Sequence, residues 1–376
     1  MPDLLLAAER VVTPGRTLVP GWLQVEGGRI AGVGAGEPER TPDLDLPGAT
    51  VVPGFVDTHV HGGGGASFDG GEPEQVARAV EAHRSSGTTT MLGSVVTDSA
   101  DGLVSSVRGL ATLVEAGLLA GIHLEGPWLS ELHAGAHDPT LLLHPTPELV
   151  DRLVAAGGGH LRMVTVAPEL PGALDAIRRL TAAGVVVAVG HTDATYDQAR
   201  AALDAGASVA THLYNTMRGL HHREPGPVAA LLEHPQAYVE IIADGVHVHP
   251  AMVGLAAGAK PHRLVLVTDA MAAAGAADGS YRLGRLDVTV RDGVARLASG
   301  AIAGSTATMA SAVRFAVREA GLSLEDAVRA ATATPAALHG LPRVGQLHPG
   351  LDADLVVLDE RLEVQRVMRH GEWLGP

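Results

Sequence analysis

Residues 52–65 read VPGFVDTHVHGGGG, an apolar run that ends in two histidines and four glycines. A short apolar run bounded by glycine and proline is typical of a buried strand. Residues two apart in a strand point to the same side, so we expect His59 and His61 to project together from its carboxyl end. The glycines leave room for backbone or ligand to come close. This stretch therefore predicts a strand with a functional rim.

Seven further apolar runs follow, and helical patterns lie between most of them. The eight predicted strands cover residues 52–60, 88–96, 118–125, 162–167, 185–190, 207–213, 238–243 and 263–268. Helical periodicity is clearest over 74–87 and 251–260. Eight strand–helix units predict a closed parallel (β/α)8 barrel, TIM-like and of the α/β class. A doubly wound open sheet is the alternative, but the GxGxxG first turn typical of that fold is missing.

The two ends of the chain have a different character. Strand-like runs punctuated by glycine and proline fill residues 3–52, and residues 350–374 resemble them. We expect a small β-sandwich domain built from residues 1–52 plus 347–376, with the barrel over 53–346. An alternating pattern around an Asp-Gly turn in 285–299 predicts a hairpin inserted after the eighth strand.

Composition excludes several functions. The 376 residues include no cysteine, so disulfides and thiolate metal ligands are excluded, which fits a cytoplasmic location. A net charge of −15 argues against nucleic acid or an anionic membrane as a partner. No secretory signal pattern appears, and no apolar run approaches the roughly 20 residues that span a bilayer. Lys260 is the only lysine, which nearly rules out phosphate-loop, Schiff-base and carbamylated bridging lysines.

Other predicted strands also end in residues that bind metals. Glu125 ends the third strand, His191 follows the fifth, His212 lies on the sixth and Asp269 follows the eighth. The carboxyl ends of barrel strands meet at one rim, so these side chains should converge with the two histidines of the first strand. Nitrogen and oxygen donors of this kind suit Zn or Fe. The set predicts a divalent metal site. A purely structural role for all six is the alternative.

The order of several motifs resembles one enzyme family. HVHGGGG, HLEGPWLSELHAGAH, GHTDAT, THLYNTM, REPG, IADGVHV, LVTDAMAAAG and AGSTATM follow one another as in the N-acetylglucosamine-6-phosphate deacetylase family of the amidohydrolase superfamily. The resemblance covers nearly the whole chain. It implies a barrel with a β-sandwich from both termini, a homodimer, and metal-dependent hydrolysis of N-acetyl-D-glucosamine 6-phosphate to D-glucosamine 6-phosphate and acetate.

The resemblance also implies roles at matching positions. The positions that match the family's metal ligands are Glu125, His191 and His212. His59 and His61 are also present and would hold a second ion bridged by Glu125. One or two ions per subunit would then bind. Asp269 matches the catalytic aspartate, which would take a proton from water and deliver it to the departing amine. His137 matches a histidine near the substrate carbonyl, where it could donate to the developing oxyanion.

For the substrate, the resemblance implies phosphate contacts from Arg223 and His247, part of them across the dimer interface. The remaining substrate-contacting positions are Ala136, Asn215, Thr216, Asp244, Ile302, Ala303 and Gly304. Thr216 stands where alanine is common in the family, and the SELHAGAH loop lacks the lysines that some members have. Both departures concern substrate selectivity rather than the metal chemistry.

Three other functions stay open at this point. N-acetylgalactosamine-6-phosphate deacetylase is the nearest, because its substrate differs at one hydroxyl. A ring-opening amidohydrolase of the dihydroorotase or dihydropyrimidinase type is disfavoured, because such enzymes typically use a bridging lysine. A catalytically inactive scaffold protein with the amidohydrolase fold is also disfavoured, since such proteins usually lose ligands and all six candidates are present here.

Overall fold

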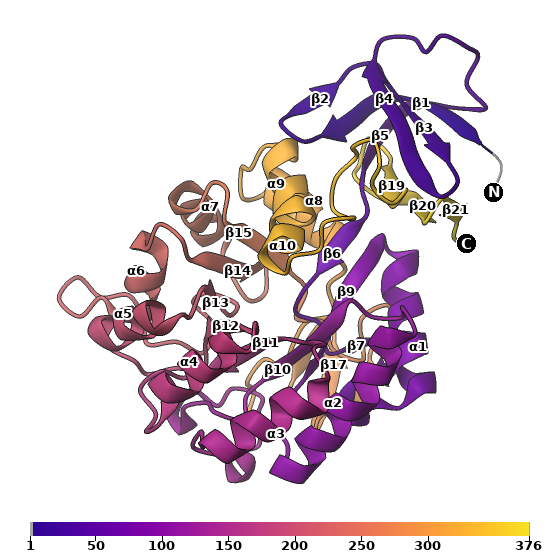
Figure 1. The fold of residues 1–376 in the computed structure, drawn as a ribbon. Coiled ribbons are helices and arrows are strands. Elements are labelled where there is room, and N and C mark those ends of the chain that lie inside the picture. The colour runs from indigo at the N-terminus through magenta and orange to yellow at the C-terminus, as the bar shows by residue number, and fades with distance from the viewer. Residues whose placement is uncertain (1–2, 376) are drawn as a thin grey trace.

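The computed structural model describes residues 3–375, and its centre is an eight-stranded parallel sheet (Figure 1). The strands pair in chain order, each with the next. They are β6 (Phe55–Asp57), β9 (Thr88–Val95), β10 (Gly121–Glu125), β11 (Leu161–Val166), β12 (Val186–Val189), β13 (Val209–Ala210), β14 (Tyr238–Ile242) and β15 (Leu264–Val267). Every strand lies in or overlaps a predicted range. The prediction of a TIM-like barrel is confirmed.

The first and last strands meet at the carboxyl rim. Val60 and Ala270 form a parallel bridge just beyond β6 and β15. The amide of Asp269 donates to the carbonyl of His59 at 2.8 Å, and the amide of His61 donates to that of Ala270 at 2.8 Å. The backbone that closes the barrel therefore carries three of the predicted site residues.

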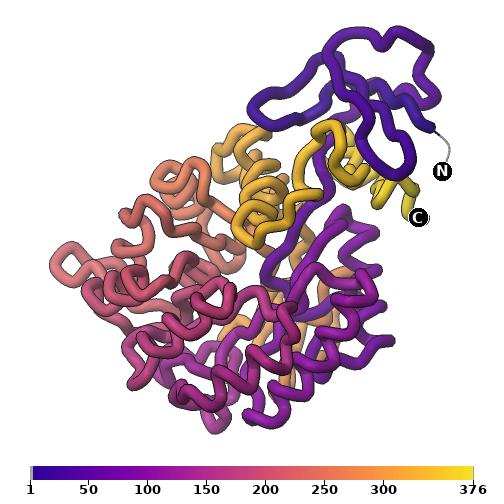
Figure 2. The backbone as a smooth tube through the Cα atoms, in the orientation of Figure 1, coloured from indigo at the N-terminus to yellow at the C-terminus, as the bar shows by residue number. Residues whose placement is uncertain are grey.

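Helices surround this sheet, as the tube view shows (Figure 2). They are α1 (Pro73–Ser85), α2 (Ala100–Glu115), α3 (Pro147–Gly157), α4 (Ala173–Ala182), α5 (Tyr196–Ala205), α6 (Gly226–Glu233), α7 (Pro250–Ala259), α8 (Met309–Arg318), α9 (Leu324–Ala330) and α10 (Ala333–Leu338). Short 3-10 turns occupy Asp69–Gly71, Glu131–His133 and Pro139–Leu141. In α1 the buried side chains are Val76, Ala79, Val80 and His83, which share one face of the helix.

Strands from both termini form a separate eight-stranded sheet beside the barrel (Figure 1). They are β1 (Leu4–Thr13), β2 (Arg16–Leu18), β3 (Gly21–Glu26), β4 (Arg29–Ala35), β5 (Leu44–Pro53), β19 (Leu355–Leu358), β20 (Val364–Arg369) and β21 (Glu372–Trp373). Antiparallel pairing of β5 with β19 joins the N-terminal strands to the C-terminal strands. The predicted terminal domain is confirmed, while its division into 1–52 plus 347–376, against 53–346, stays a prediction.

The terminal sheet has its own core and also packs on the barrel. Leu6, Leu23 and Leu355 belong to the internal cluster. Val52 and Val356 instead join the main barrel cluster. Alternate residues of a strand face opposite sides, so β5 and β19 serve both cores at once.

A small antiparallel sheet follows the last barrel strand. It consists of β16 (Gly279–Leu283), β17 (Leu286–Arg291) and β18 (Val294–Arg296), with β17 in the middle. The predicted hairpin corresponds to β17 and β18, and β16 is an additional strand that the alternating pattern did not reveal. Asp292 and Gly293 have φ of 51° and 71°, as a two-residue hairpin turn requires.

In the described part of the chain, every helix is too short or too polar to pass through a bilayer.

Candidate metal centre

His59 and His61 lie where β6 ends, and both are almost completely buried. Their Nε2 atoms are 3.1 Å apart, as expected for side chains two residues apart on an extended backbone. The glycines that follow are needed because the chain turns back tightly here. A Cβ atom on Gly62 would lie 2.3 Å from the carbonyl oxygen of Ala66, so no larger residue fits.

Glu125 occupies the middle of the site, at the end of β10. Its Oε1 lies 3.1 Å from Nε2 of His191 and 2.8 Å from Nε2 of His212. Its Oε2 lies 3.2 Å from Nε2 of His61 and 3.3 Å from Nε2 of His137. Burial opposes ionisation of this carboxyl, but His59 and its other histidine neighbours hold the pKa of Glu125 well below its usual value.

Asp269 follows β15 and faces His59 and His61. Its Oδ1 is 3.4 Å from Nε2 of His59 and 3.3 Å from Nε2 of His61. Burial would raise the pKa of Asp269, but His59 and His61 outweigh burial and lower it to about 2. The side chain is therefore an ionised carboxylate near neutral pH.

Two groups of side chains have a geometry that could hold an ion, and Glu125 belongs to both. One comprises His59, His61, Glu125 and Asp269, and the other comprises Glu125, His191 and His212. All six members are buried. The six residues predicted to meet at the rim therefore do so, with a shared carboxylate between two sets of nitrogen and oxygen donors. That donor chemistry suits zinc and other divalent transition metals.

Hydrogen bonds set the ring nitrogens of two histidines for metal binding. Nδ1 of His191 donates to the carbonyl of His133 at 2.8 Å, and Nδ1 of His59 lies 3.2 Å from a carboxylate oxygen of Glu240. An acceptor at Nδ1 keeps the proton there and leaves a lone pair on Nε2. Both Nε2 atoms point at Glu125 and at another histidine Nε2. Nε2 atoms only 3.1 and 3.2 Å apart, together with the carboxylate oxygens of Glu125, can be bridged by one cation, so the set fits a metal ion.

His137 lies at the same centre from the loop after β10. The amide of Thr97 donates to its Nδ1 at 3.3 Å, so Nδ1 is an acceptor and the proton lies on Nε2. Burial lowers the pKa of His137 to about 4, although Glu125 opposes this shift. The ring is therefore neutral near pH 7, with an N–H directed into the site.

A cavity of about 220 Å³ opens over the centre. The predicted residues that line it are His61, Glu125, Ala136, His137, His191, His212, Asn215, Thr216, His247, Asp269, Ile302 and Gly304. Gly135, Ile242, Leu283 and Ala301 complete the wall and were not predicted. Ala303 is fully buried in the core of the small β-sheet instead.

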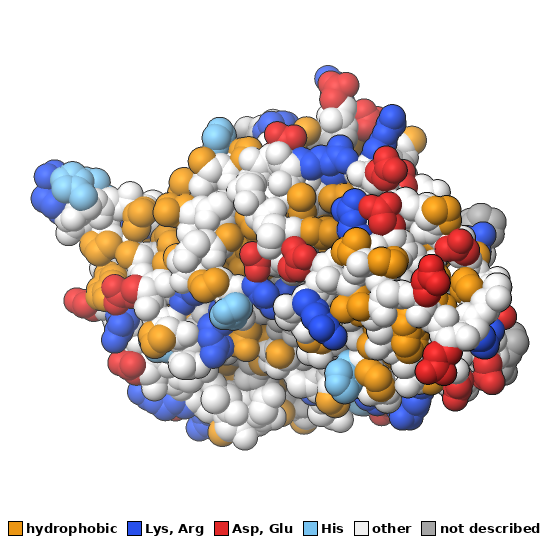
Figure 3. Space-filling model, turned by 90° about the horizontal axis from the view of Figure 1, so that it is seen from above, with side chains coloured by type: hydrophobic (Ala, Val, Ile, Leu, Met, Phe, Trp, Pro, Cys, Tyr) orange, Lys and Arg blue, Asp and Glu red, His pale blue; other side chains and the backbone are white. Residues whose placement is uncertain are grey.

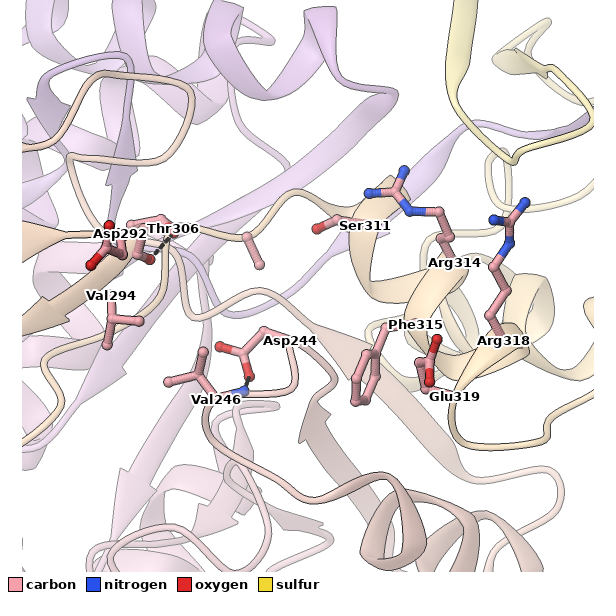
Figure 4. Close-up of a pocket in the computed structure, with 12 residues that line it drawn as sticks. Asp244, Val246, Asp292, Val294, Thr306, Ser311, Arg314, Phe315, Arg318 and Glu319 are labelled. Atoms are coloured by element: carbon pink, nitrogen blue, oxygen red, sulfur yellow. Dashed lines mark hydrogen bonds between the residues drawn. The ribbon is translucent and has the colours of Figure 1, made fainter.

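Asp244 borders a second cavity beside the first, of about 530 Å³ (Figure 4). Its Oδ2 accepts from Nδ1 of His247 at 2.7 Å. Burial lowers the pKa of His247, but Asp244 outweighs burial and raises it. Asp244 therefore acts on the first cavity through His247. Arg314 and Arg318, both from α8, lie on the opposite side of this second space (Figure 4).

Arg223 lies away from both cavities. It is exposed, on the loop between β13 and α6, and its Nη1 is 2.8 Å from Nε2 of His222. That loop extends outward from the barrel (Figure 1), and a projection on the same side carries His and Lys or Arg side chains (Figure 3). In a single chain, the structure does not bring Arg223 to the predicted site.

Several buried polar residues below the centre were missed from the sequence. Glu240 contacts His59, and Nδ1 and Nε2 of His123 each lie 3.0 Å from a hydroxyl oxygen, of Ser94 and of Thr165. Each had a signal in the sequence. Glu240 is the one charged residue in the strand YVEII, and His123 is two residues before Glu125 in GIHLE.

The backbone is strained at the same place. His191, His212, Thr216 and Asp269 all have positive φ, at 47°, 26°, 50° and 49°. Residues other than glycine rarely adopt this conformation, and it concentrates at functional sites, where the surrounding structure maintains it.

A parallel α/β barrel with buried His, Glu and Asp side chains gathered at its carboxyl rim is an architecture of metal-dependent hydrolases. Residues 50–374 match the model of the amidohydrolase family, so the chain belongs to this family. N-acetylgalactosamine-6-phosphate deacetylase of Escherichia coli O157:H7 is 38% identical, covering 98% of each chain. N-acetylglucosamine-6-phosphate deacetylase of Vibrio furnissii is 36% identical over 92% of this chain and 88% of its own.

A solved structure is more similar still. It is an aspartate-to-alanine mutant of N-acetyl-D-glucosamine-6-phosphate deacetylase from Mycobacterium smegmatis, in complex with N-acetyl-D-glucosamine-6-phosphate. Its sequence is 53% identical, its TM-score is 0.97, and the match covers 99% of both chains.

Proposed function

We propose that this chain removes the acetyl group from N-acetyl-D-glucosamine 6-phosphate, giving D-glucosamine 6-phosphate and acetate. The observation that carries the proposal is the position of Glu125, shared by two groups of buried ligands beneath a cavity of about 220 Å³. The substrate assignment is supported by the relatives, of which the mycobacterial enzyme has the highest identity of those described above.

For the metal, we assign Glu125, His191 and His212 to one ion, and His59, His61 and Glu125 to a second. Zn and Fe both suit these donors. A divalent cation in such a site lowers the pKa of water and polarises a carbonyl. One or two ions per subunit are consistent with the two groups.

The protein's own groups then handle protons. Asp269 is ionised at neutral pH, so its carboxylate can take a proton from the attacking water and deliver it to the amine, which must leave protonated. His137 carries its proton on Nε2 and can donate it in a hydrogen bond to the carbonyl oxygen as negative charge develops there. A donor of this kind is typically worth about 10²–10³-fold in rate.

Substrate binding divides between the cavity wall and a second subunit. Asn215, Thr216, Ala136 and the backbone near Ile302, Ala303 and Gly304 would contact the sugar. Near the phosphate we place His247, whose pKa Asp244 raises, which favours the cationic form of the ring. Arg223 would reach the phosphate of a partner subunit, since it is exposed on a loop that extends outward from the barrel (Figure 1). The active form is therefore a homodimer in this proposal, and its cytoplasmic location stays a prediction.

A second candidate is N-acetylgalactosamine-6-phosphate deacetylation, because the Escherichia coli relative of that name is 38% identical over nearly the whole chain. An acetate-release assay with both phosphorylated sugars and both unphosphorylated sugars separates the alternatives. Metal-stripped protein should first be reconstituted with Zn²⁺ or Fe²⁺. Faster turnover of the galacto substrate would replace the proposed substrate, and no release from any of the four would favour an inactive scaffold.

A further inference from the structure

A cluster of polar side chains outside the cavity surrounds Asp193, on the loop between β12 and α5. Nε and Nη2 of Arg218 donate to its two carboxylate oxygens at 3.1 and 2.7 Å. Nε2 of His133 lies 3.2 Å from the same carboxylate. The carboxylate is thus held by two partners from different loops.

His133 connects this carboxylate to a ligand of the metal centre. Its carbonyl accepts the Nδ1 proton of His191 at 2.8 Å. The amide of Ser130 donates to the carbonyl of His191 at 2.9 Å, and the amide of His133 donates to that of Ser130 at 3.0 Å. Asp193, two residues beyond His191, therefore closes a ring of contacts that runs through His133 and back to His191.

The backbone of the Asp193 loop is fixed on both sides. The amide of Thr192 donates to the carbonyl of Thr216 at 3.0 Å, and the amide of Arg218 donates to that of Thr192 at 3.0 Å. On the opposite side, Glu169 accepts from the amide of Asp193 at 2.7 Å. Asp193 is thus a fixed point, whereas His133 lies in a single 3-10 turn of three residues, Glu131–His133.

We propose that Asp193 is a positioning residue for His191. Its side-chain contact with His133 holds the His133 carbonyl against Nδ1 of His191, and this orients the Nε2 lone pair of His191 toward the ion. The inference rests on the proposed function, because it takes His191 as a ligand. Stabilisation alone does not require the contact with His133, because Arg218 already binds both carboxylate oxygens of Asp193. The side chains of Asp193, His133 and Arg218 are 29%, 22% and 32% exposed.

The same contacts affect the cavity wall. The loop that His133 anchors continues to Ala136 and His137, and both line the cavity. Loss of the contact should therefore loosen the oxyanion donor as well as the ligand. Supporting groups behind a ligand of this kind are typically worth about 10–100-fold in metal affinity.

The test is Zn²⁺ binding to metal-stripped protein, measured by competition with a chromogenic chelator. The variants are Asp193→Asn, His133→Ala and the double variant. Asp175→Asn is the matched control, because Asp175 pairs with Arg179 at 2.9 Å on the outer surface of α4, where both side chains are exposed. We expect Zn²⁺ affinity about 10–100-fold weaker in both single variants, with no further loss in the double variant.

Thermal unfolding of the metal-free proteins provides the second readout. Equal melting temperatures for Asp193→Asn and Asp175→Asn, together with unequal Zn²⁺ affinities, would establish positioning rather than stabilisation. Wild-type affinity in Asp193→Asn and His133→Ala would overturn the inference while leaving the proposed function intact. If wild-type protein binds neither Zn²⁺ nor Fe²⁺, the proposed function fails, and this inference fails with it.

Discussion

Replacing Asp269 by Asn tests the proposed chemistry most directly. Asparagine has the same shape, and its amide oxygen can occupy the position of Oδ1, at 3.4 and 3.3 Å from the Nε2 atoms of His59 and His61. It cannot accept a proton from water. The substitution thus removes one chemical capacity and leaves the packing of the site almost unchanged.

The size of the effect follows from the surrounding groups. Among the described residues that line the cavity, the carboxylates are Glu125 and Asp269. Both oxygens of Glu125 already face histidine nitrogens, so no second carboxylate is free to act as the base. Loss of a general base typically costs about 10²–10⁴-fold. With no substitute base we expect the upper end, about 10⁴-fold in kcat, which corresponds to about 5 kcal/mol.

Metal content should respond differently, because Asp269 belongs to only one of the two groups. The group of Glu125, His191 and His212 does not include it. Acetate release and metal analysis on the same preparation would show a nearly inactive protein that keeps at least one ion. Activity within tenfold of wild type would refute the assignment of the base, and a metal-free protein would make Asp269 an essential ligand instead.

Three further predictions concern other parts of the molecule. Glu240→Gln removes the carboxylate from Nδ1 of His59. Chelator competition should therefore show about 10–100-fold weaker binding of one ion, with binding of the other unchanged. Equal weakening of both ions would contradict the division into two groups. Arg223→Ala should raise KM for the phosphorylated sugar alone. Mixing this variant with Asp269→Asn subunits should restore activity, because a mixed dimer keeps one complete site. Absence of restoration would place Arg223 outside the partner's site. Burial lowers the pKa of His339 to about 3. The unfolded chain then takes up a proton first as pH falls below about 6.5, and this proton uptake lowers the stability of the fold. The free energy of unfolding therefore falls between pH 7 and pH 4.5, and in His339→Leu this fall should be about 2–3 kcal/mol smaller when measured by urea unfolding. An unchanged fall would mean that the ring is protonated in the folded state.

Much of the barrel follows from local patterns. The strands β9 and β14 are buried on both faces, as parallel strands covered by helices must be, and their ends coincide with the predicted ends within one residue. In contrast, β16 reads GSYRL and alternates between partly buried and exposed residues, with only Leu283 buried, and its partner is β17. A strand of this kind has little signal of its own, because its partner decides its structure.

The metal centre was predictable for a related reason. His191 and Asp269 each follow an apolar strand, and the geometry of a closed barrel brings such positions together. Residues that act from behind the ligands were harder to find. Glu240 and Asp193 contact the centre through pairings between neighbouring strands and loops, and those contacts depend on a register that the sequence does not state. The place where Arg223 would act also cannot be seen in a single chain, because its expected target is the phosphate bound by another subunit.

The pairing of β5 with β19 has a consequence for how the protein is made. The first of these strands leaves the ribosome early, but its partner begins at Leu355, near the end of the chain. During synthesis the edge of β5 that pairs with β19 therefore stays unpaired until nearly the whole barrel has been translated. Exposed apolar strand edges favour aggregation. Truncated chains that end before residue 355 should therefore be insoluble, even when they contain every residue of the metal centre.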